Sequence, residues 1–171
     1  YVQMKLGAHS AVAFDISAAC SGFLYAMKLA KRLISDGAYK NALIIGAEKL
    51  SSVTNWEDRN TCVLFGDGAG AAVLRRSEEG EGRILATEMG TDGRYTQLLD
   101  IKGGGSACPI THANVDEHLH TLSMQGREIF KLAVNAMRNA SETVIERAGL
   151  TPEDIKLVVP HQANLRIIDA I

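Results

Sequence analysis

Two segments of the sequence repeat one pattern, in which a short apolar run ends at a reactive side chain and an apolar-periodic stretch follows. The first is AVAFDI (11–16), followed by Cys20 and by the periodic residues 21–37. The second is IKLVVP (155–160), followed by His161 and by a periodic stretch that runs to the end. Short apolar runs favour buried strands, and apolar residues three and four apart favour helices. Each reactive residue is therefore expected at a strand-to-helix junction, where α/β proteins place their sites.

Further strands are expected in the first half of the chain. NALIIGAE (41–48) is apolar throughout, which predicts a strand covered on both faces. TCVLFGDGAGAAVLRR (61–76) predicts a strand, a glycine-rich interruption and a second strand, and 83–92 resumes strand. Together with the two junctions, this order predicts a layered α/β fold and is compatible with two related halves.

Polar stretches and one long periodic stretch complete the prediction. Residues 51–60 and 102–121 are expected to be loops. Residues 123–149 form the longest expected helix, capped by Ser123 and ended by Gly149. Thr151, Pro152 and Asp154 then have the spacing of a helix start.

Composition excludes several classes of protein. Hydrophobic residues make up 46% of the 171-residue chain, enough for a substantial core, and the net charge of -2 argues against a general nucleic-acid binder. Three cysteines are too few for a disulfide framework, and without a signal peptide they indicate a reducing, cytoplasmic compartment. No apolar run approaches the length of a membrane span. The chain lacks an initiator Met and stops within a periodic stretch, so a fragment of a longer protein is expected.

Cys20 and His161 are the candidates for chemistry. At the start of a helix, unpaired N–H groups favour a thiolate, which is a nucleophile, and the N–H of Cys20 could also stabilise an oxyanion. His161 could act as an acid, a base or a hydrogen-bond donor. The alternatives remain open at this point: Cys20 as a small buried apolar side chain, and His161 as a capping or half-buried histidine.

Two other patterns are weaker. GDGAGA (66–71) resembles a phosphate loop, but a β-rich run follows it instead of a helix, which makes a dinucleotide site improbable. The stretch 102–121 holds several potential metal ligands without a known ligand spacing, so no metal site is expected there. These ligands are Cys108, His112, His118 and His120.

Four motifs in order resemble the β-ketoacyl-acyl-carrier-protein synthase III family, the initiating condensing enzymes of bacterial fatty-acid synthesis. They are AFDISAACSGFLYAM, FGDGAGAAVL, MQGREIFKLAV and VVPHQANLRII. The resemblance extends from about residue 11 to the end, and PHQANLR is its most specific part. It implies a thiolase-like layered α/β fold of two related halves, here incomplete at both ends. Residues 1–112 would be the latter part of the N-terminal half, and 113–171 the start of the C-terminal half.

The resemblance also implies a reaction. Cys20 matches the nucleophile that takes a short acyl group from acyl-CoA. His161 matches the histidine that stabilises the enolate formed when malonyl-acyl-carrier protein loses CO₂, and that carbanion attacks the acyl-enzyme. A thiolate suits both steps because it is nucleophile and leaving group. No cofactor or metal is implied. The partners implied are acyl-CoA and acyl-carrier protein, with no nucleic acid and no membrane, in a cytoplasmic homodimer.

Further residues match singly, each against the plainer alternative of a solvated or core side chain. Arg59 matches the arginine that packs on the adenine of CoA. Met124, Gly126 and Phe130 match the lining of the pantetheine route and acyl pocket, and Asn164 is expected to be structural near this substrate-binding region. Lys131 and Arg166 match basic positions that dock the acidic carrier protein, and Arg127 could join them.

Other functions stay open on this basis. A related synthase of secondary metabolism would use the same Cys20 and His161 on another acyl starter. A non-catalytic homologue would only bind the carrier protein, and a thiol hydrolase would release the acyl group to water. The family's third catalytic residue, an asparagine, and its glycine-rich oxyanion segment lie beyond the residues of this sequence, so the fragment alone is expected to be catalytically incomplete.

Overall fold

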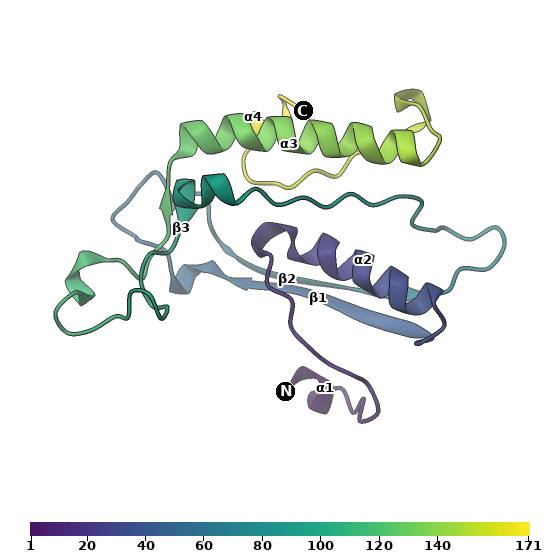
Figure 1. Ribbon diagram of the computed structural model, residues 1–171, viewed down its shortest axis with the longest axis horizontal. Helices are drawn as coiled ribbons and strands as arrows, with labels where there is room; N and C mark the ends of the chain where they lie inside the picture. Colours follow the sequence, from purple (N-terminus) through teal and green to yellow (C-terminus); the bar gives the residue numbers. More distant parts are fainter. The chain divides into compact units, whose positions relative to one another are not determined.

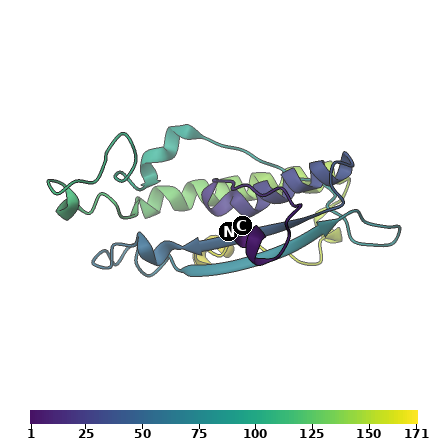
Figure 2. The same ribbon diagram turned by 90° about the horizontal axis from the view of Figure 1, so that it is seen from below.

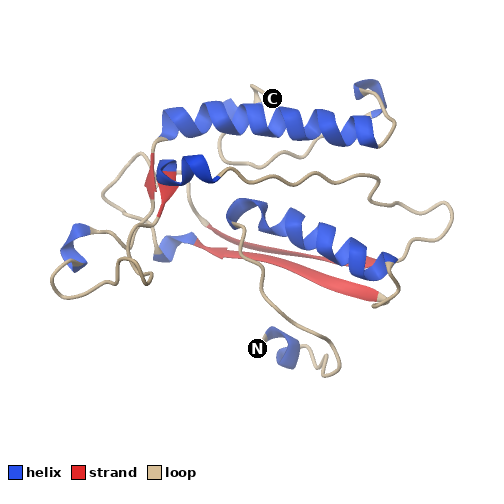
Figure 3. Cartoon of the chain, in the orientation of Figure 1, coloured by secondary structure: helices blue, strands red, loops and turns tan.

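The computed structural model describes all residues from Tyr1 to Ile171. Its α-helices are α1 (Val2–Lys5), α2 (Gly22–Ser35), α3 (Gly126–Arg147) and α4 (Leu165–Ile168) (Figure 1). Its strands are β1 (Asn41–Lys49), β2 (Asp67–Arg75), β3 (Leu99–Asp100) and β4 (Ser123–Met124), drawn red in Figure 3. Short 3-10 helices are η1 (Ala19–Ser21), η2 (Leu50–Ser52), η3 (Gly93–Leu98), η4 (Val115–Glu117) and η5 (Pro152–Asp154). The mixture of helix and strand agrees with the predicted α/β class.

The chain divides into two compact units. Unit 1 comprises Tyr1–Ile44 and Ala72–Arg76, and unit 2 comprises Ile45–Ala71 and Ser77–Ile171. Strands β1 and β2, the two long strands of Figure 2, pair in a two-stranded sheet. Helix α2 lies in unit 1, whereas α3, α4 and the β3–β4 pair lie in unit 2. The predicted division between residues 112 and 113 stays a prediction.

Helix α2 confirms the helix expected over 21–37. Ala30 and Ile34, four residues apart and so on one face, are buried, as is Ile44 of β1 in the same unit. The helix ends before Gly37, which has φ +79, and the amide of Gly37 donates to Ile34 O at 3.1 Å. Glycine adopts this left-handed conformation without the penalty of a Cβ, so it ends the helix.

Strand β1 confirms the strand expected over 41–48, but not its coverage on both faces. Ile44 is only 4% exposed, whereas Leu43 and Ile45, which point to the opposite face, are each 46% exposed. One face of β1 is therefore covered in this chain. The prediction of two covered faces is wrong for these residues, since Leu43 and Ile45 on the second face are exposed.

Strand β2 corrects the interpretation of residues 61–76. The strand begins at Asp67 and includes Gly68 and Gly70, so the glycines are part of the strand and do not interrupt it. The expected strand before them is a turn, because the amides of Thr61 and Cys62 both donate to Asp58 O, at 3.1 and 2.9 Å. Thr61 is fully buried, which fixes the turn in place.

Three expected strands are absent from the structure: 11–16, 83–92 and 155–160 lie outside every helix and strand and are tan in Figure 3. Their apolar side chains are largely solvent-exposed, with Val12 at 65%, Phe14 at 60% and Leu157 at 77%. A strand exists only through hydrogen bonds to a neighbouring strand, and the described sheets supply no neighbour for these segments. Short apolar runs alone therefore overpredicted strand.

Helix α3 confirms the long helix but starts three residues later than expected. Ser123 does not cap it, because Ser123 and Met124 form β4, which pairs antiparallel with Asp100 and Leu99 of β3. Gln125 precedes the helix without a side-chain cap, and its amide donates to Leu98 O at 2.8 Å. The other end agrees with the prediction, since Gly149 has φ +69 just beyond Arg147. No helix of the structure has both the length and the apolar character needed to cross a membrane.

The stretch 102–121 is irregular apart from η4, as expected, yet it has a packed interior. The buried Gly103 donates its amide to Leu119 O at 2.7 Å. A Cβ at this position would lie 2.6 Å from Cδ1 of Ile110 and 2.9 Å from Cβ of Leu119. Glycine is required here because the backbone and these side chains approach too closely for any other residue.

Candidate active site

Cys20 lies in the 3-10 turn η1, which continues directly into the 14-residue helix α2. Its thiol is exposed, so the alternative of a buried apolar side chain does not describe this structure. Ser21 does not cap the helix through its side chain, and the first turn holds no acidic residue. The N–H groups at this end are thus free of a competing protein carboxylate, and they favour negative charge that develops beside them.

The residue before Cys20 has an unusual backbone conformation. Ala19 has φ +44, in the left-handed region that side chains with a Cβ rarely adopt. Such a conformation costs about 1–2 kcal/mol, and it is often found where a functional side chain must be presented. The turn at Ala19 directs the chain abruptly into α2 and leaves Cys20 exposed.

Space beside Cys20 follows from its small neighbours. A Cβ built on Gly22 meets no atom within 4 Å. The flanking Ala18 and Ala19 carry only methyl side chains. Within unit 1, small side chains and the open space at Gly22 therefore adjoin the exposed Cys20 thiol.

His161 lies between Pro160 and the four-residue helix α4 and is exposed. No hydrogen bond or ion pair holds its imidazole. Asn164 is the N-cap of α4, and its Oδ1 accepts a hydrogen bond from the amide of Ile167 at 3.0 Å. The strand expected before His161 is absent, so the histidine follows an irregular segment. Its side chain is neither buried nor a helix cap.

Arg59 lies exposed in a turn that is rigidly anchored. Asp58 Oδ1 accepts hydrogen bonds from the amide and the side chain of Asn60, both at 3.0 Å, and Asp58 Oδ2 accepts one from Thr61 Oγ1 at 2.9 Å. The amide of Asn60 and then the Thr61 hydroxyl lower the pKa of Asp58. The Asp58 carboxylate is therefore engaged within the turn, and the Arg59 guanidinium is left without a protein partner.

Met124, Gly126 and Phe130 lie close together along the chain where β4 meets α3. Met124 is half-buried in β4 and not in a helix, and its Cε lies 3.5 Å from the position that a Cβ of Gly126 would occupy. Phe130 is half-buried one turn after Gly126. The structure thus brings Met124 and Gly126 into contact range, while a lining role for the three residues stays a prediction.

The basic candidates Lys131, Arg166 and Arg127 are all exposed. Lys131 Nζ is 3.7 Å from Glu128 Oε1, a solvent-exposed pair of the kind that adds little stability. Lys131 therefore remains accessible to an acidic partner. Docking of a carrier protein at these residues stays a prediction.

The candidates do not all fall in one unit. Cys20 belongs to unit 1, whereas His161 and every other candidate residue belong to unit 2. The roles of these residues and the pairing of Cys20 with His161 stay predictions.

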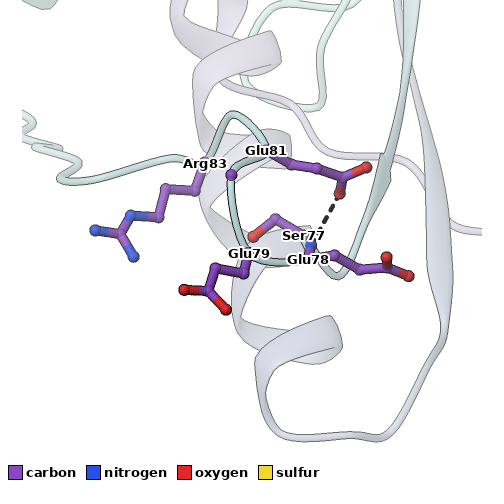
Figure 4. Close-up of a pocket in the computed structure, with 6 residues that line it drawn as sticks. Ser77, Glu78, Glu79, Glu81 and Arg83 are labelled. Atoms are coloured by element: carbon purple, nitrogen blue, oxygen red, sulfur yellow. Dashed lines mark hydrogen bonds between the residues drawn. The ribbon is translucent and has the colours of Figure 1, made fainter.

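The potential metal ligands of 102–121 do not form a cluster. His118 and His120 have ring centroids 6.2 Å apart, but no three His, Cys, Asp or Glu side chains are placed to hold a metal ion. A separate hollow lies at the turn after β2, and Figure 4 shows its carboxylates, with Glu81 Oε2 accepting from the amide of Glu78 at 2.8 Å. It contains no candidate residue, and its acidic lining is unfavourable for an anionic acyl-CoA. The lining residues are Ser77, Glu78, Glu79, Gly80, Glu81 and Arg83.

Sequence reasoning missed three structural supports of the site. An N-cap role for Asn164 was detectable, since Asn is a preferred N-cap, as was the Asp58–Thr61 turn, since Asp favours such turns. The conformation of Ala19 had no signal, because alanine is not a residue that marks a left-handed position.

Comparisons with known proteins identify the family of the chain. The family 3-oxoacyl-(acyl-carrier-protein) synthase III matches residues 14–93, and the C-terminal part of that family matches residues 145–171. A β-ketoacyl-(acyl-carrier-protein) synthase III of Caldanaerobacter subterraneus subsp. tengcongensis is 54% identical over 169 residues, which are 99% of this chain and 51% of that relative.

Solved structures show the same relationship. The 3-oxoacyl-(acyl-carrier-protein) synthase III of Aquifex aeolicus has a TM-score of 0.84 and 49% identity, covering 99% of this chain and 50% of that one. The priming β-ketosynthase of the R1128 polyketide pathway has a TM-score of 0.85 and 35% identity, covering 99% and 49%. The fold is therefore thiolase-like, as predicted.

The extent of these matches sets what they mean. This chain spans about half the length of the curated relatives it matches, so they define its family and its fold and leave the whole protein's activity to be tested. The predicted membership is confirmed: the chain belongs to the 3-oxoacyl-(acyl-carrier-protein) synthase III family, also called the β-ketoacyl-acyl-carrier-protein synthase III family.

Proposed function

We propose that the protein containing this chain is a condensing acyltransferase, which loads a short acyl group from acyl-CoA onto Cys20 and condenses it with malonyl-acyl-carrier protein. The observation that carries the proposal is the exposed Cys20 thiol at the start of α2, in a chain that belongs to this family. The uncapped N–H groups of α2 favour the negative charge that the first step requires.

In the first half-reaction, the Cys20 thiolate attacks the carbonyl carbon of acyl-CoA. The carbon–sulfur bond to CoA breaks, CoA leaves as a thiolate that takes up a proton, and the acyl group stays on Cys20 as a thioester. Negative charge on the carbonyl oxygen in the tetrahedral intermediate would be stabilised by backbone N–H groups beside Cys20. A thiolate is a good nucleophile and a good leaving group, so the thioester can be both formed and consumed.

In the second half-reaction, malonyl-acyl-carrier protein loses CO₂ and leaves an enolate. His161 is proposed to donate a hydrogen bond to the enolate oxygen, which its unpartnered imidazole is free to do. The enolate carbon attacks the Cys20 thioester, the Cys20 thiolate leaves, and the β-ketoacyl group remains on the carrier protein. This step initiates fatty-acid synthesis.

Substrate and partner contacts follow from the same assignment. Arg59, exposed on its anchored turn, is proposed to pack on the adenine of CoA, and Met124, Gly126 and Phe130 to lie along the substrate route, with Asn164 in a structural role near the site. Lys131 and Arg166 would dock the acidic carrier protein. The resemblance supports a cytoplasmic homodimer without a cofactor, and light scattering coupled to gel filtration would measure the oligomeric state.

A second candidate is a priming synthase of secondary metabolism. The 35% identity to the R1128 priming β-ketosynthase favours it, although the identity to the synthase III of C. subterraneus subsp. tengcongensis is 54%. The two candidates share Cys20 and His161 and differ in the acyl starter. The donor preference of the protein therefore decides between them.

The test is intact-mass analysis of the full-length protein after incubation with acetyl-CoA or isobutyryl-CoA, followed by peptide mapping. We expect one acyl adduct on Cys20, which Cys20→Ala abolishes. His161→Ala should keep the adduct and lower condensation with malonyl-acyl-carrier protein by about 1000-fold or more.

Cys108→Ala is the matched control, since Cys108 is a free cysteine outside the proposed chemistry and should leave the adduct unchanged. An adduct that is absent with both donors would overturn the short-acyl assignment. An adduct that is hydrolysed without any need for the malonyl substrate would indicate a thiol hydrolase instead.

A further inference from the structure

Asn164 has a role in the fold that differs from contact with a substrate. Its Oδ1 accepts from the amide of Ile167 at 3.0 Å, and its backbone oxygen accepts from the same amide at 3.2 Å. With φ -162 and ψ 158 it is extended, so the chain turns into α4 at this residue. The acceptor end of the side-chain amide is thus engaged by the backbone, while the donor end is not.

Helix α4 is firmly held on the other side of this cap. Ile167, the residue whose amide Asn164 binds, is only 3% exposed. Arg138 of α3 donates from Nη2 to Ala170 O at 2.8 Å, just beyond α4. Helices α3 and α4 contact each other, and both belong to unit 2. Figure 1 labels α4 next to α3, near the C-terminus. The cap therefore ties residue 164 to a fixed part of the fold.

His161 lies three residues before this cap and has no anchor of its own. Its imidazole makes no hydrogen bond or ion pair, and residues 155–163 form no helix or strand. Three residues of chain reach at most about 11 Å, so a fixed residue 164 restricts the space that His161 can explore. Loss of the cap would free the turn and the histidine together.

We propose that Asn164 is a positioning residue, which holds His161 in place by capping α4 through its side-chain oxygen. The inference rests on the proposed function, in which His161 acts in the second half-reaction. It implies that the reaction needs the acceptor oxygen of Asn164 and not its amide donor. A carboxylate should therefore replace the amide, because Asp caps helices as well as Asn does.

The test uses three variants of the full-length protein. Asn164→Asp keeps the acceptor, Asn164→Gln keeps the amide but is too long to cap, and Asn164→Ala removes both. Decarboxylation of malonyl-acyl-carrier protein should fall about 10-fold or more in the Ala and Gln variants, a part of the roughly 100-fold that general acid–base groups contribute. The Asp variant should stay within about 3-fold of the wild type, and acylation of Cys20 should be unchanged in all three.

A second measurement does not depend on activity. Hydrogen exchange of the amides in residues 165–168 should speed up in the Ala and Gln variants and stay slow in the Asp variant. The His161 imidazole resonances should likewise change in the Ala and Gln variants and stay as in the wild type in the Asp variant. Thr151→Ala is the matched control, because it weakens the cap of η5 and should leave residues 165–168 unchanged.

The outcomes separate this inference from the function on which it rests. If Asn164→Asp is as slow as Asn164→Ala, the amide donor contacts the substrate and the positioning role is wrong. If Asn164→Ala matches the wild type in both measurements, the cap does not hold His161 in place and the positioning role is wrong. The wild-type protein could lack decarboxylation while hydrogen exchange of residues 165–168 is still faster in the Ala and Gln variants than in the Asp variant. That result would contradict the proposed function and still support the cap.

Discussion

Cys20 and His161 each precede a helix, but the two helices are held in different ways. Helix α2 has 14 residues and two buried side chains one turn apart, Ala30 and Ile34. Helix α4 has four residues and depends on Ile167 and on the Asn164 cap. The two junctions also differ in backbone strain. Ala19, beside Cys20, has a left-handed conformation. The only other non-glycine residue with a positive φ is His118, so no such strain lies beside His161.

The difference shows two solutions to one problem, the presentation of a reactive side chain. A long helix can tolerate strain at its first turn because many contacts oppose it. A single-turn helix has no such reserve, so a cap and one buried side chain must hold it. We therefore expect the Cys20 junction to resist local changes and the His161 junction to be sensitive to them.

The largest effect is expected at Ile167. Ile167→Ala should lower the free energy of unfolding by about 2–5 kcal/mol, the range for truncation of a buried aliphatic side chain. It should also slow malonyl decarboxylation more than Cys20 acylation. Ile34→Ala should cost a similar free energy and spare acylation, because the rest of α2 remains anchored by Ala30.

Urea unfolding and the two half-reactions measure these effects. Leu165→Ala is the matched control in α4, since Leu165 is 69% exposed and its truncation should change stability by no more than about 0.5 kcal/mol. If Ile34→Ala lowered Cys20 acylation as much as Ile167→Ala lowers decarboxylation, the two junctions would not differ as proposed.

A smaller effect is expected at Ala19. Ala19→Val should destabilise the protein by about 1–2 kcal/mol, because a β-branched residue tolerates φ +44 less well than alanine does. Ala19→Gly should stay within about 1 kcal/mol of the wild type, since glycine relieves the strain but adds chain entropy. Thermal unfolding compares them with Gln162→Val beside His161, where φ is not positive and the change should be small. If Ala19→Val proves as stable as the wild type, the conformation is not strained.

The smallest effect concerns pH and the turn that precedes His161. The Asp154 side chain accepts from the amide of Thr151 at 2.9 Å and from its hydroxyl at 3.0 Å, and these bonds lower the pKa of Asp154 below 3.8. A lowered pKa in the folded state stabilises the fold above the unfolded-state value, and the contribution is lost as the pH falls through the folded-state value.

Below about pH 4, therefore, the amide resonance of Thr151 should shift as Asp154 takes up a proton. Titration by NMR measures the midpoint, which should lie below 3.8. Asp154→Asn removes the titration and serves as the control. A midpoint at or above 3.8 would mean that the capping box does not favour the carboxylate.

Local features of the sequence were enough for the helices and their ends. The spacing of apolar residues located α2 and α3, and Gly37 and Gly149 marked where each stops, because these signals act within one or two turns of chain. Local sequence was also enough to single out Cys20, from the small residues around it, and His161, from the proline before it. Family membership also followed from short motifs in their order.

Tertiary structure alone decided the strands and the supports of the site. Residues 11–16 and 155–160 have the apolar pattern of strands but no hydrogen-bonded neighbour, while Ser123 joins β4 because Asp100 lies opposite it. The close approach of Gly103 to Leu119 and the left-handed Ala19 likewise depend on what surrounds them. A helix satisfies its backbone within its own sequence, whereas a strand, a close contact or a strained turn exists only through residues distant in the chain.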